Sequence, residues 1–135
     1  MQIGSFIAEN DIDCTKNIVG IETIMEAEEK VGVSFGPELR KYLLTWGYLG
    51  FESVEFYGMN SRQNLESDMV SQTLYIHTYF PSTSELIAIE SLGDGEYALV
   101  DAEDRVFILD TEEQSLMSLE RKLFEYMLDR FMNEE

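Results

Sequence analysis

Residues 85–110 read ELIAIESLGDGEYALVDAEDRVFILD, and this stretch decides the fold. It contains three strand-like runs, at 85–91, 96–101 and 105–110, in which apolar residues predominate. Short turn segments separate the runs, and the first segment contains Asp94-Gly95, a pair that favours a tight turn between antiparallel strands. The spacing therefore predicts an antiparallel meander of three strands.

A helix is predicted upstream of the meander, in the segment IETIMEAEEKVG at 21–32. The periodicity of its apolar residues is typical of an amphipathic helix with glutamates on the outer side. Gly32 is a suitable C-terminal stop. The residues expected on or near the buried face are Ile21, Ile24, Met25 and Val31.

A second helix is expected to begin at Pro37, because proline favours the first helical turn. Its apolar residues follow at the spacing i, i+3, i+4 and i+7, so they share one face. These residues are Leu39, Tyr42, Leu43 and Trp46. Gly47 can adopt the left-handed conformation that ends such a helix.

Trp46 is the only tryptophan, and it stands beside Gly47 and near Gly50. In that setting it could line a binding site, stack on a base or sugar, or close a core. Since it is the last member of the apolar face, we expect it to pack in the core. Pro37, Trp46 and Gly47 are therefore interpreted as structural residues. If Trp46 is fully buried, its replacement by alanine is expected to cost about 3–5 kcal/mol of stability.

The remaining segments complete an α+β pattern. Residues 51–59 alternate enough to predict a strand, and Asn64 can cap a third helix at about 65–77, with Leu65, Met69 and Ile76 inward. The chain is expected to be helical again from about Ser118. The apolar face of this last helix is expected to comprise Leu119, Leu123, Phe124, Met127, Leu128 and Phe131. The order of elements predicts one α+β domain over residues 1–135, with helices flanking an antiparallel or mixed sheet.

Charge is the strongest compositional signal. The chain has 27 acidic and 9 basic side chains, which gives a formal net charge of −18. Such a field repels nucleic acid and anionic membranes and steers cationic partners inward. Direct binding to nucleic acid or to a membrane is therefore not expected. General solubility is the alternative explanation, although the charge exceeds what solubility requires.

The chain is expected to be a soluble cytoplasmic protein. Cys14 is the only cysteine, so an internal disulfide and a cysteine zinc cluster are both excluded. The N-terminus, MQIGSFIAEN, lacks the cationic start and the apolar run of a signal peptide. No stretch approaches the roughly 18 apolar residues that a transmembrane helix needs.

Residue patterns that would indicate catalysis are weak. His77 is the only histidine, and neither it nor Cys14 lies in a recognisable catalytic motif. Asp11-x-Asp13 is not followed by the other oxygen ligands of an EF-hand, and LGDG lacks the lysine of a phosphate-binding loop. We therefore predict a non-enzymatic binding protein with no catalytic residue, metal or cofactor.

The elements in this order resemble the SUKH superfamily, which includes bacterial toxin-immunity proteins and homologues of yeast cell-wall regulators. The resemblance covers about residues 21–131. It is carried by Ile21, Glu28 and Gly32, by Pro37-Glu38 through Leu44, by ELIAIESLGDGEYALVD, and by RVFILDTEE with Asp110, Glu112 and Glu113. The chain departs from the family pattern at Gly36, Leu109 and Thr111, where an apolar residue, an aromatic residue and a histidine are commoner.

The resemblance implies a six-strand-like mixed or antiparallel sheet with flanking helices. It also implies a function, because many bacterial members neutralise a polymorphic toxin, often a nuclease with a cationic cleft. An acidic protein docked on such a cleft would gain electrostatic steering and would block the substrate. The leading hypothesis is an immunity protein for a basic toxin domain. The alternatives are an intracellular regulatory or scaffold module and an enzyme with a concealed site that pairs His77 with a carboxylate or Cys14.

Partner-binding candidates follow from the predicted hairpin tips and strand ends. The acidic candidates are Glu52, Glu55, Asp94, Glu96, Glu103, Asp104, Glu112 and Glu113. Tyr48 and Tyr57 are the expected aromatic anchors, because aromatic residues often dominate binding energy at interfaces. For each carboxylate the alternative is a role in a merely solvated acidic surface.

Overall fold

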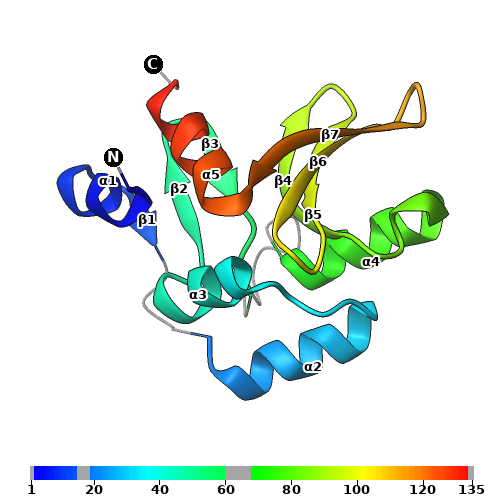
Figure 1. The fold of residues 1–135 in the computed structure, drawn as a ribbon, viewed down its shortest axis with the longest axis horizontal. Coiled ribbons are helices and arrows are strands. Elements are labelled where there is room, and N and C mark those ends of the chain that lie inside the picture. Colours follow the sequence, from blue (N-terminus) through cyan, green and yellow to red (C-terminus); the bar gives the residue numbers. More distant parts are fainter. Residues whose placement is uncertain (1, 15–18, 60–67, 134–135) are drawn as a thin grey trace.

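The computed structural model describes residues 2–14, 19–59 and 68–133 and has an α+β fold (Figure 1). Its helices are α1 (Ile3–Glu9), α2 (Ile21–Val31), α3 (Pro37–Thr45), α4 (Met69–Tyr79), the short 3-10 helix η2 (Pro81–Thr83) and α5 (Leu123–Met132). Its strands are β1 (Asp13–Cys14), β2 (Leu49–Phe51), β3 (Val54–Phe56), β4 (Ile87–Gly93), β5 (Glu96–Val100), β6 (Arg105–Asp110) and β7 (Ser115–Lys122). The predicted fold class is confirmed.

The strands form two antiparallel sheets, with the orders β1-β2-β3 and β4-β5-β6-β7. This arrangement replaces the one six-strand-like sheet that the family resemblance implied. The two sheets meet where the backbone N–H of Tyr57, just after β3, donates to the carbonyl of Ile89 in β4 at 2.8 Å. We call this meeting point of β3 and β4 the seam.

The predicted meander is confirmed in β4, β5 and β6, which pair in sequence order. Asp94 and Gly95 both have positive φ angles, 52° and 79°, as the tight turn requires. The prediction of helix from Ser118 is wrong, because the chain forms β7 first and α5 starts at Leu123. Since β7 is an edge strand whose side chains are nearly all exposed, it lacks the alternation that identifies a half-buried strand.

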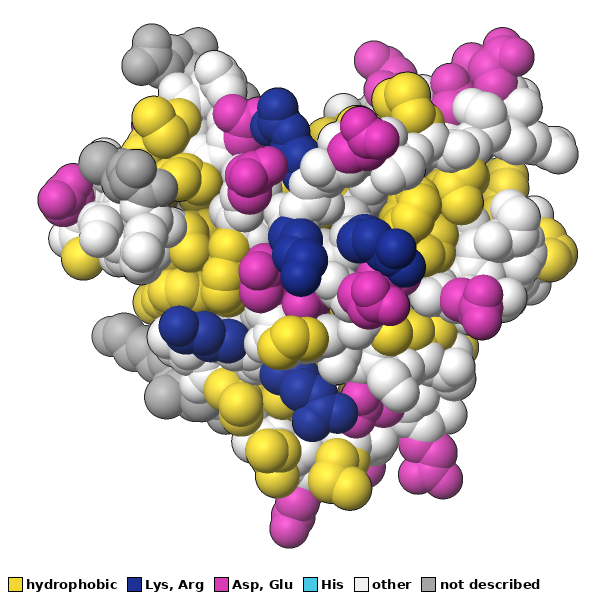
Figure 2. Space-filling model, in the orientation of Figure 1, with side chains coloured by type: hydrophobic (Ala, Val, Ile, Leu, Met, Phe, Trp, Pro, Cys, Tyr) yellow, Lys and Arg dark blue, Asp and Glu magenta, His cyan; other side chains and the backbone are white. Residues whose placement is uncertain are grey.

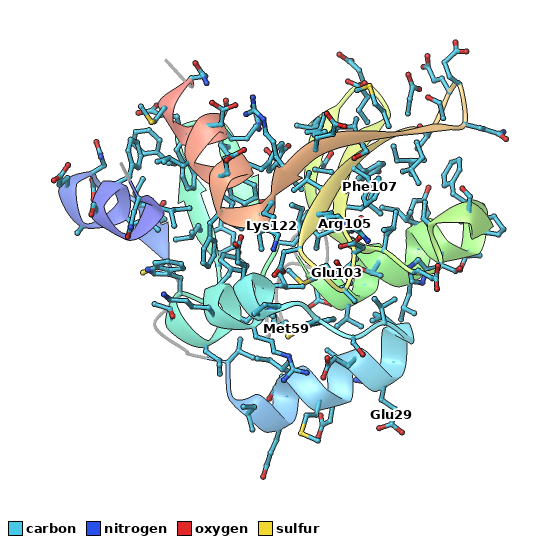
Figure 3. All side chains as sticks on the ribbon, in the orientation of Figure 1. Glu29, Met59, Glu103, Arg105, Phe107 and Lys122 are labelled. Atoms are coloured by element: carbon cyan, nitrogen blue, oxygen red, sulfur yellow. The ribbon has the colours of Figure 1, made fainter. Side chains whose placement is uncertain are left out.

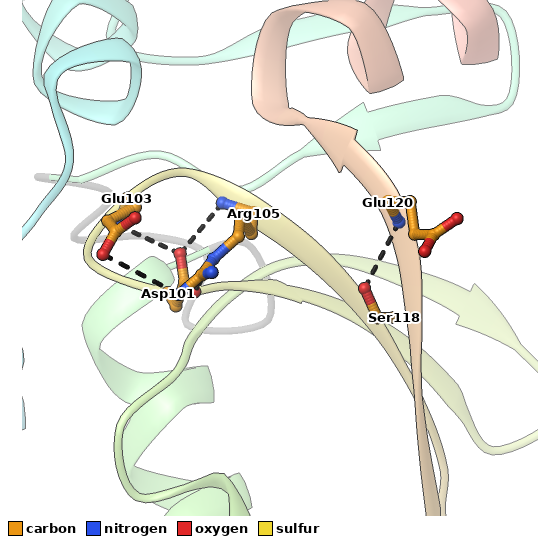
Figure 4. A network of polar contacts seen from close by, with 5 residues as sticks. All are labelled: Asp101, Glu103, Arg105, Ser118 and Glu120. Atoms are coloured by element: carbon orange, nitrogen blue, oxygen red, sulfur yellow. Dashed lines mark hydrogen bonds and ion pairs between the residues drawn. The ribbon is translucent and has the colours of Figure 1, made fainter.

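A bulge in the last part of β7 redirects the chain into α5. The pairing with β6 shifts register between Arg105 and Phe107, and Glu120 has a φ of 57°. Ser118 Oγ accepts a hydrogen bond from the backbone N–H of Glu120 at 3.3 Å (Figure 4). Bulges increase local bending of a strand, and here the bend turns the chain from the four-stranded sheet towards the three-stranded one (Figure 1).

Helix α2 ends where the sequence predicts, but its buried face is narrower. Gly32 has a φ of 73° and donates to the carbonyl of Glu28, which confirms it as the stop. Ile24 and Val31 are buried as expected, together with Ala27. The expectation that Ile21 and Met25 are inward is wrong, because they are 54% and 59% exposed. The small Ala27 extends the contact stripe in their place.

Helix α3 has Pro37 in its first turn, and Leu39, Tyr42 and Leu43 are fully buried, as predicted. Gly47 has a φ of 74°, which confirms its role in ending the helix. Trp46 is only half-buried, and its ring packs edge-on against Phe124 with the ring centroids 6.1 Å apart. Trp46 therefore packs against the core, as predicted, but is not fully buried.

The stretch 51–59, predicted as one strand, contains the end of β2, a turn and the short strand β3. Strands β2 and β3 pair antiparallel, and Glu52 turns the chain with a φ of 55°. Helix α4 begins at Met69, and its N-terminus is capped by the Asp68 side chain, which accepts from the Ser71 N–H at 2.9 Å. The predicted cap Asn64, and Leu65, lie outside the described residues.

The core beneath the three-stranded sheet is aromatic and includes α1, which the sequence did not predict. The rings of Phe6 and Phe131 stack with centroids 5.9 Å apart, and Phe56 meets Phe131 edge-on at 5.3 Å. These contacts join α1, β3 and α5, so elements from both ends of the chain lie side by side (Figure 1). Packing of this kind depends on contacts distant in sequence, which local periodicity does not reveal.

A buried polar network ties α5 to the four-stranded sheet. Glu90 of β4 is 1% exposed, and its carboxylate accepts from the Tyr126 hydroxyl at 2.6 Å and from Arg130 Nη2 at 2.6 Å. Burial, followed by the charge of Glu90, raises the pKa of Tyr126 well above its usual value. The phenol therefore stays protonated and donates to Glu90.

Candidate partner-binding site

A polar hollow of about 390 Å³ lies at the seam. It draws side chains from the β2–β3 hairpin, the start of α4, and strands β4 and β5. We call it the seam hollow, and its lining residues are Ser53, Glu55, Tyr57, Gln72, Ser91 and Tyr97. Two predicted partner-binding residues, Glu55 and Tyr57, are thus brought together in one concave site.

Strand alternation and a tyrosine hold Glu55 in place. Val54 and Phe56 on either side of it are buried, so the pleat points Glu55 away from the core. Its carboxylate accepts a hydrogen bond from the Tyr48 hydroxyl at 2.6 Å. Burial, together with this bond to Glu55, raises the pKa of Tyr48, so the phenol keeps the proton that it donates. Tyr48 therefore positions Glu55.

The base of the seam hollow is formed by Tyr57, which is 3% exposed. Its pKa is raised above the usual value by burial first, and further by Tyr97, Glu55 and Glu90, while a hydrogen bond with Ser91 acts in the opposite direction. The phenol is therefore neutral. The expectation that Tyr57 is an exposed aromatic anchor is wrong, because the residue lies below the surface and contributes only to the floor of the hollow.

Four of the acidic candidates, those of the β4–β5 and β6–β7 turns, gather at one end of the four-stranded sheet. The backbone N–H and the hydroxyl of Thr111 both donate to the carbonyl of Gly95, at 2.9 and 2.7 Å, and so tie the β4–β5 and β6–β7 turns together. Figure 2 shows acidic side chains at this end, at upper right. We call this group the acidic tips, and its members are Asp94, Glu96, Asp110, Glu112 and Glu113.

The acidic tips concentrate like charges. Glu96 and Asp110 are cross-strand partners, and the backbone N–H groups of Glu112 and Glu113 both donate to Asp110 Oδ1. Asp94, Glu112 and Glu113 are exposed to solvent. Opposed carboxylates destabilise a sheet slightly. The fold therefore carries a concentrated negative field at the two turns.

Basic side chains lie elsewhere on the surface. In Figure 2 the lysines and arginines occupy the middle and left of the view, away from the acidic end. Arg105 and Lys122, labelled in Figure 3, lie in this middle region. Arg105 Nε is 2.7 Å from Asp101 Oδ2 and Arg40 Nη2 is 2.8 Å from Glu28 Oε2. On the face that Figure 2 shows, the basic side chains are therefore interspersed with acidic ones, whereas the upper right end is acidic.

The remaining acidic candidates do not join either group. Glu52 is exposed at the β2–β3 turn, and Glu103 is exposed at the β5–β6 turn, the opposite end of the sheet from the acidic tips. Asp104 follows Glu103 but is fully buried. The prediction that Asp104 is an exposed partner-binding residue is therefore wrong. Its carboxylate binds backbone N–H groups of α3.

Other residues of the seam hollow were not predicted from the sequence. Ser91 and Tyr97 become neighbours because β4 and β5 pair them across the strands. Gln72 reaches the hollow from α4, and Ser53 from the β2–β3 turn. Strand β5 was predicted from the sequence, but the register between the strands was not.

A second, more apolar pocket of about 410 Å³ lies between α1, α3 and α5. Trp46 lines it together with Phe124 and Leu128. The half-buried Trp46 therefore packs against the core and also borders this pocket. Its polar lining residues include Lys41 and Glu125.

The two residues considered for catalysis, His77 and Cys14, lie on different elements, α4 and β1. His77 Nε2 lies 2.7 Å from the carbonyl of Leu86, so this nitrogen carries the proton and links α4 to the chain before β4. Cys14 is exposed on β1. Within the described ranges, no three His, Cys, Asp or Glu side chains are grouped as metal ligands.

Comparison with models of known protein families identifies the family of this chain. A SUKH family model, described as SMI1-KNR4 cell-wall, matches residues 11–132. The chain therefore belongs to the SUKH superfamily, whose members of this type are generally non-catalytic. No curated protein matches the chain. None of the helices in the described part of the chain has the length and apolar character that crossing a bilayer requires.

Proposed function

We propose that this protein is a cytoplasmic immunity protein that binds and neutralises a cognate polymorphic toxin by occluding its cationic site. A nuclease is the expected toxin, because nucleases need a basic surface to hold their substrate. Membership of the SUKH superfamily is compatible with this role. The observation that carries the proposal is the clustering of carboxylates at the acidic tips, tied together by Thr111 and Gly95.

The acidic tips suit the first stage of binding. Exposed carboxylates attract a basic partner over roughly 8–10 Å at physiological ionic strength, which raises the rate of encounter. Because Asp94 and Glu112 sit on turns that project from the sheet, they reach a partner before the body of the protein does (Figure 1). A nuclease cleft covered in this way would lose its substrate by direct competition.

The seam hollow adjoins the acidic tips through strands β4 and β5. Ser91 pairs with Tyr97, and Gly93 pairs with Glu96 at the adjacent turn. The two strands therefore run from the seam hollow to the turn that carries Asp94 and Glu96. A concave site beside a charged rim provides the desolvated centre that binding energy requires.

A non-enzymatic regulatory or scaffold module is the second candidate function. The description of the matching family, SMI1-KNR4 cell-wall, favours it. Under this alternative the protein binds a regulatory partner, and the acidity serves mainly solubility. A toxin gene beside this gene distinguishes the two candidates.

Co-expression with the toxin domain encoded next to this gene tests the proposal. We expect growth to be rescued and a complex to form whose affinity falls as salt is added. The tip variant D94N/E112Q/E113Q is compared with the control E22Q/E26Q/E29Q on α2, since both remove the same number of exposed charges. Glu29 points away from the body of the protein (Figure 3).

The tip variant is expected to slow association about tenfold, whereas the α2 control stays within about twofold of the unaltered protein. Equal effects of the two variants would show that only net charge matters. Absence of both rescue and complex formation would favour the regulatory module.

A further inference from the structure

We propose that the outer edge of β7 pairs antiparallel with the same strand of a second copy of this chain. The four-stranded sheet has the order β4-β5-β6-β7, so β7 ends it on one side. In the part of the chain that the structure describes, no strand pairs with β7 on that side. An edge strand presents backbone N–H and C=O groups that can form a ladder with another chain. This interaction does not depend on the proposed function.

Two residues with left-handed backbone conformations mark the limits of the regular part of β7. Gln114 and Glu120 have φ angles of 53° and 57°. Between them, residues 115–118 pair with β6 without a change of register. The bulge in the last part of β7 then bends the chain towards α5, so a partner strand can follow the edge only over residues 115–119. We call these residues the pairing segment.

The pairing segment lacks the features that keep edge strands apart. Its sequence is SLMSL, with no charge and no proline, although 27% of the residues in the chain are charged. Proteins commonly protect an edge strand with charged side chains, a proline or a bulge, and here the bulge follows the paired residues 115–118. Met117 is 58% exposed and Leu116 is 37% exposed, so pairing removes apolar surface from water. We therefore expect this edge to be covered.

The order of side chains in the pairing segment is complementary to itself. With a two-fold axis at Met117, the Met117 side chains of the two copies face each other. Leu116 of each copy then faces Ser118 of the other, and Ser115 faces Leu119, so every leucine is opposite a small residue. Methionine is flexible and adapts its shape to a neighbour. A two-fold interface uses the same surface of both copies, as this segment can.

The charges at the two ends of β7 favour antiparallel pairing. Glu112 and Glu113 of the acidic tips precede the strand. At its other end Arg121 is ion-paired with Asp129, and Lys122 is exposed. Antiparallel copies place the acidic end of each strand near Lys122 of the other copy. The two acidic ends are then separated by at least the length of the pairing segment, about 17 Å, which exceeds the Debye length of about 8 Å. Parallel copies would bring the acidic ends together.

Sedimentation equilibrium of the unaltered protein tests the pairing, at protein concentrations from about 10 μM to about 1 mM and about 0.15 M salt. We expect a reversible equilibrium between monomer and dimer. Its dissociation constant should be on the order of 100 μM, because a pairing of so few residues buries less area than a standard interface. Hydrogen exchange locates the contact, since backbone amides of the pairing segment should exchange more slowly as the protein concentration rises.

Two variants with the same chemical change separate this edge from other exposed apolar surface. Met117 and Met25 are 58% and 59% exposed, and Met25 lies on α2. M117K places two like charges opposite each other at the two-fold axis, so we expect its dissociation constant to rise at least about tenfold. M25K changes the net charge equally, and its dissociation constant should stay within about twofold of that of the unaltered protein. Unchanged melting temperatures identify both variants as folded.

Three results would overturn the proposal. A protein that remains monomeric at about 1 mM does not use β7 for self-association. Equal weakening by M117K and M25K, or a dimer in which exchange of the pairing segment is unchanged, would assign the association to another surface. A monomer whose pairing segment becomes protected only when the toxin domain is added would show that β7 pairs with the toxin rather than with a second copy.

Discussion

Asp104 Oδ1 accepts a hydrogen bond from the backbone N–H of Leu39 at 3.0 Å, although the two residues lie 65 positions apart. Oδ2 of the same carboxylate accepts from the N–H of Glu38 at 2.8 Å. The N-cap residue of α3 is Gly36, which has no side chain, so the β5–β6 turn supplies the cap instead. Glu38 in turn accepts from the N–H of Phe124 at 2.8 Å and caps α5.

Replacing Asp104 with alanine should destabilise the protein by about 2–3 kcal/mol, because one buried and one partly buried N–H group would lose their acceptor. The measurement is urea unfolding at neutral pH. E103A is the matched control, since Glu103 is the adjacent carboxylate but is exposed. We expect its cost to stay within about 0.5 kcal/mol. Similar costs for both variants would mean that Asp104 does not cap α3.

A second test of the same cap uses Gly36, one of the departures from the family pattern. A Cβ placed on Gly36 would lie 2.4 Å from Asp104 Oδ1, closer than a real contact allows. Because the φ of Gly36 is −72°, the backbone itself tolerates alanine. G36A in the unaltered protein should therefore cost about 1–3 kcal/mol through displacement of the carboxylate. In a D104A background the cost should fall, and a double-mutant cycle measures this coupling.

The pH dependence of stability should carry opposite contributions from Asp101 and Asp104. Asp101 accepts from the N–H groups of Glu103 and Arg105, both at 2.9 Å, and from Arg105 Nε at 2.7 Å (Figure 4). Burial acts to raise the pKa of Asp101, but the hydrogen bonds and the charge of Arg105 outweigh it and lower the pKa. The pKa of Asp104 is raised, chiefly by burial.

The lowered pKa of Asp101 means that its ionised form stabilises the fold above the unfolded pKa of about 3.9, and that this contribution disappears as the pH falls through the folded pKa. The stability difference between the unaltered protein and D101N should therefore shrink as the pH falls below about 3.9. For D104N the trend should reverse: the contribution of Asp104 falls as the pH rises from about 3.9 through its raised folded pKa. Urea unfolding across this pH range checks both signs, and parallel trends would contradict the assignment.

The parts of the fold that sequence predicts are those set by local chemistry. The meander follows from its three apolar runs and from the turn at Asp94, and the end of α2 follows from Gly32. Strand β7 was not predicted, because the side chains of an exposed edge strand do not alternate between buried and exposed positions. The role of Asp104 as the cap of α3 was not predicted, because its partners lie 65 and 66 positions away.

Some parts of the candidate site were likewise predictable from the sequence, and others were not. Asp94 and Glu96 could be assigned to a turn and a strand end from sequence alone, and the structure gathers them with Glu112 and Glu113. The seam hollow could not be predicted, because it requires β3 to meet β4 through the bond between Tyr57 and Ile89. Its remaining lining residues become neighbours only through that contact between the sheets.

Removing Arg130 should be far more costly than removing an exposed arginine. Arg130 Nη2 and Nε lie 2.6 and 2.9 Å from Glu90 Oε2, and the carboxylate is buried. R130A would leave this charge without its ion-pair partner, which typically costs about 3–5 kcal/mol. Arg121 pairs with Asp129 at the surface, so R121A should cost only about 0–1 kcal/mol. Urea unfolding compares the two variants, and similar costs would contradict a structural role for the buried pair.

The last prediction tests whether Trp46 acts in packing or in partner binding, because the residue both packs against the core and lines a pocket. One side of the ring packs against Phe124, and the residue also lines the pocket between α1, α3 and α5. Since Trp46 is half-buried, W46A should cost less than the 3–5 kcal/mol of a fully buried aromatic, about 1.5–3 kcal/mol.

L43A provides the comparison, because Leu43 is fully buried on the same helix and should cost about 3–4 kcal/mol. Melting temperature and toxin binding are measured on both variants. If Trp46 acts through packing, W46A should lower the melting temperature and leave the affinity of the folded protein unchanged. A W46A protein that keeps its melting temperature but no longer binds its partner would instead identify Trp46 as a binding residue and move the interface to this pocket.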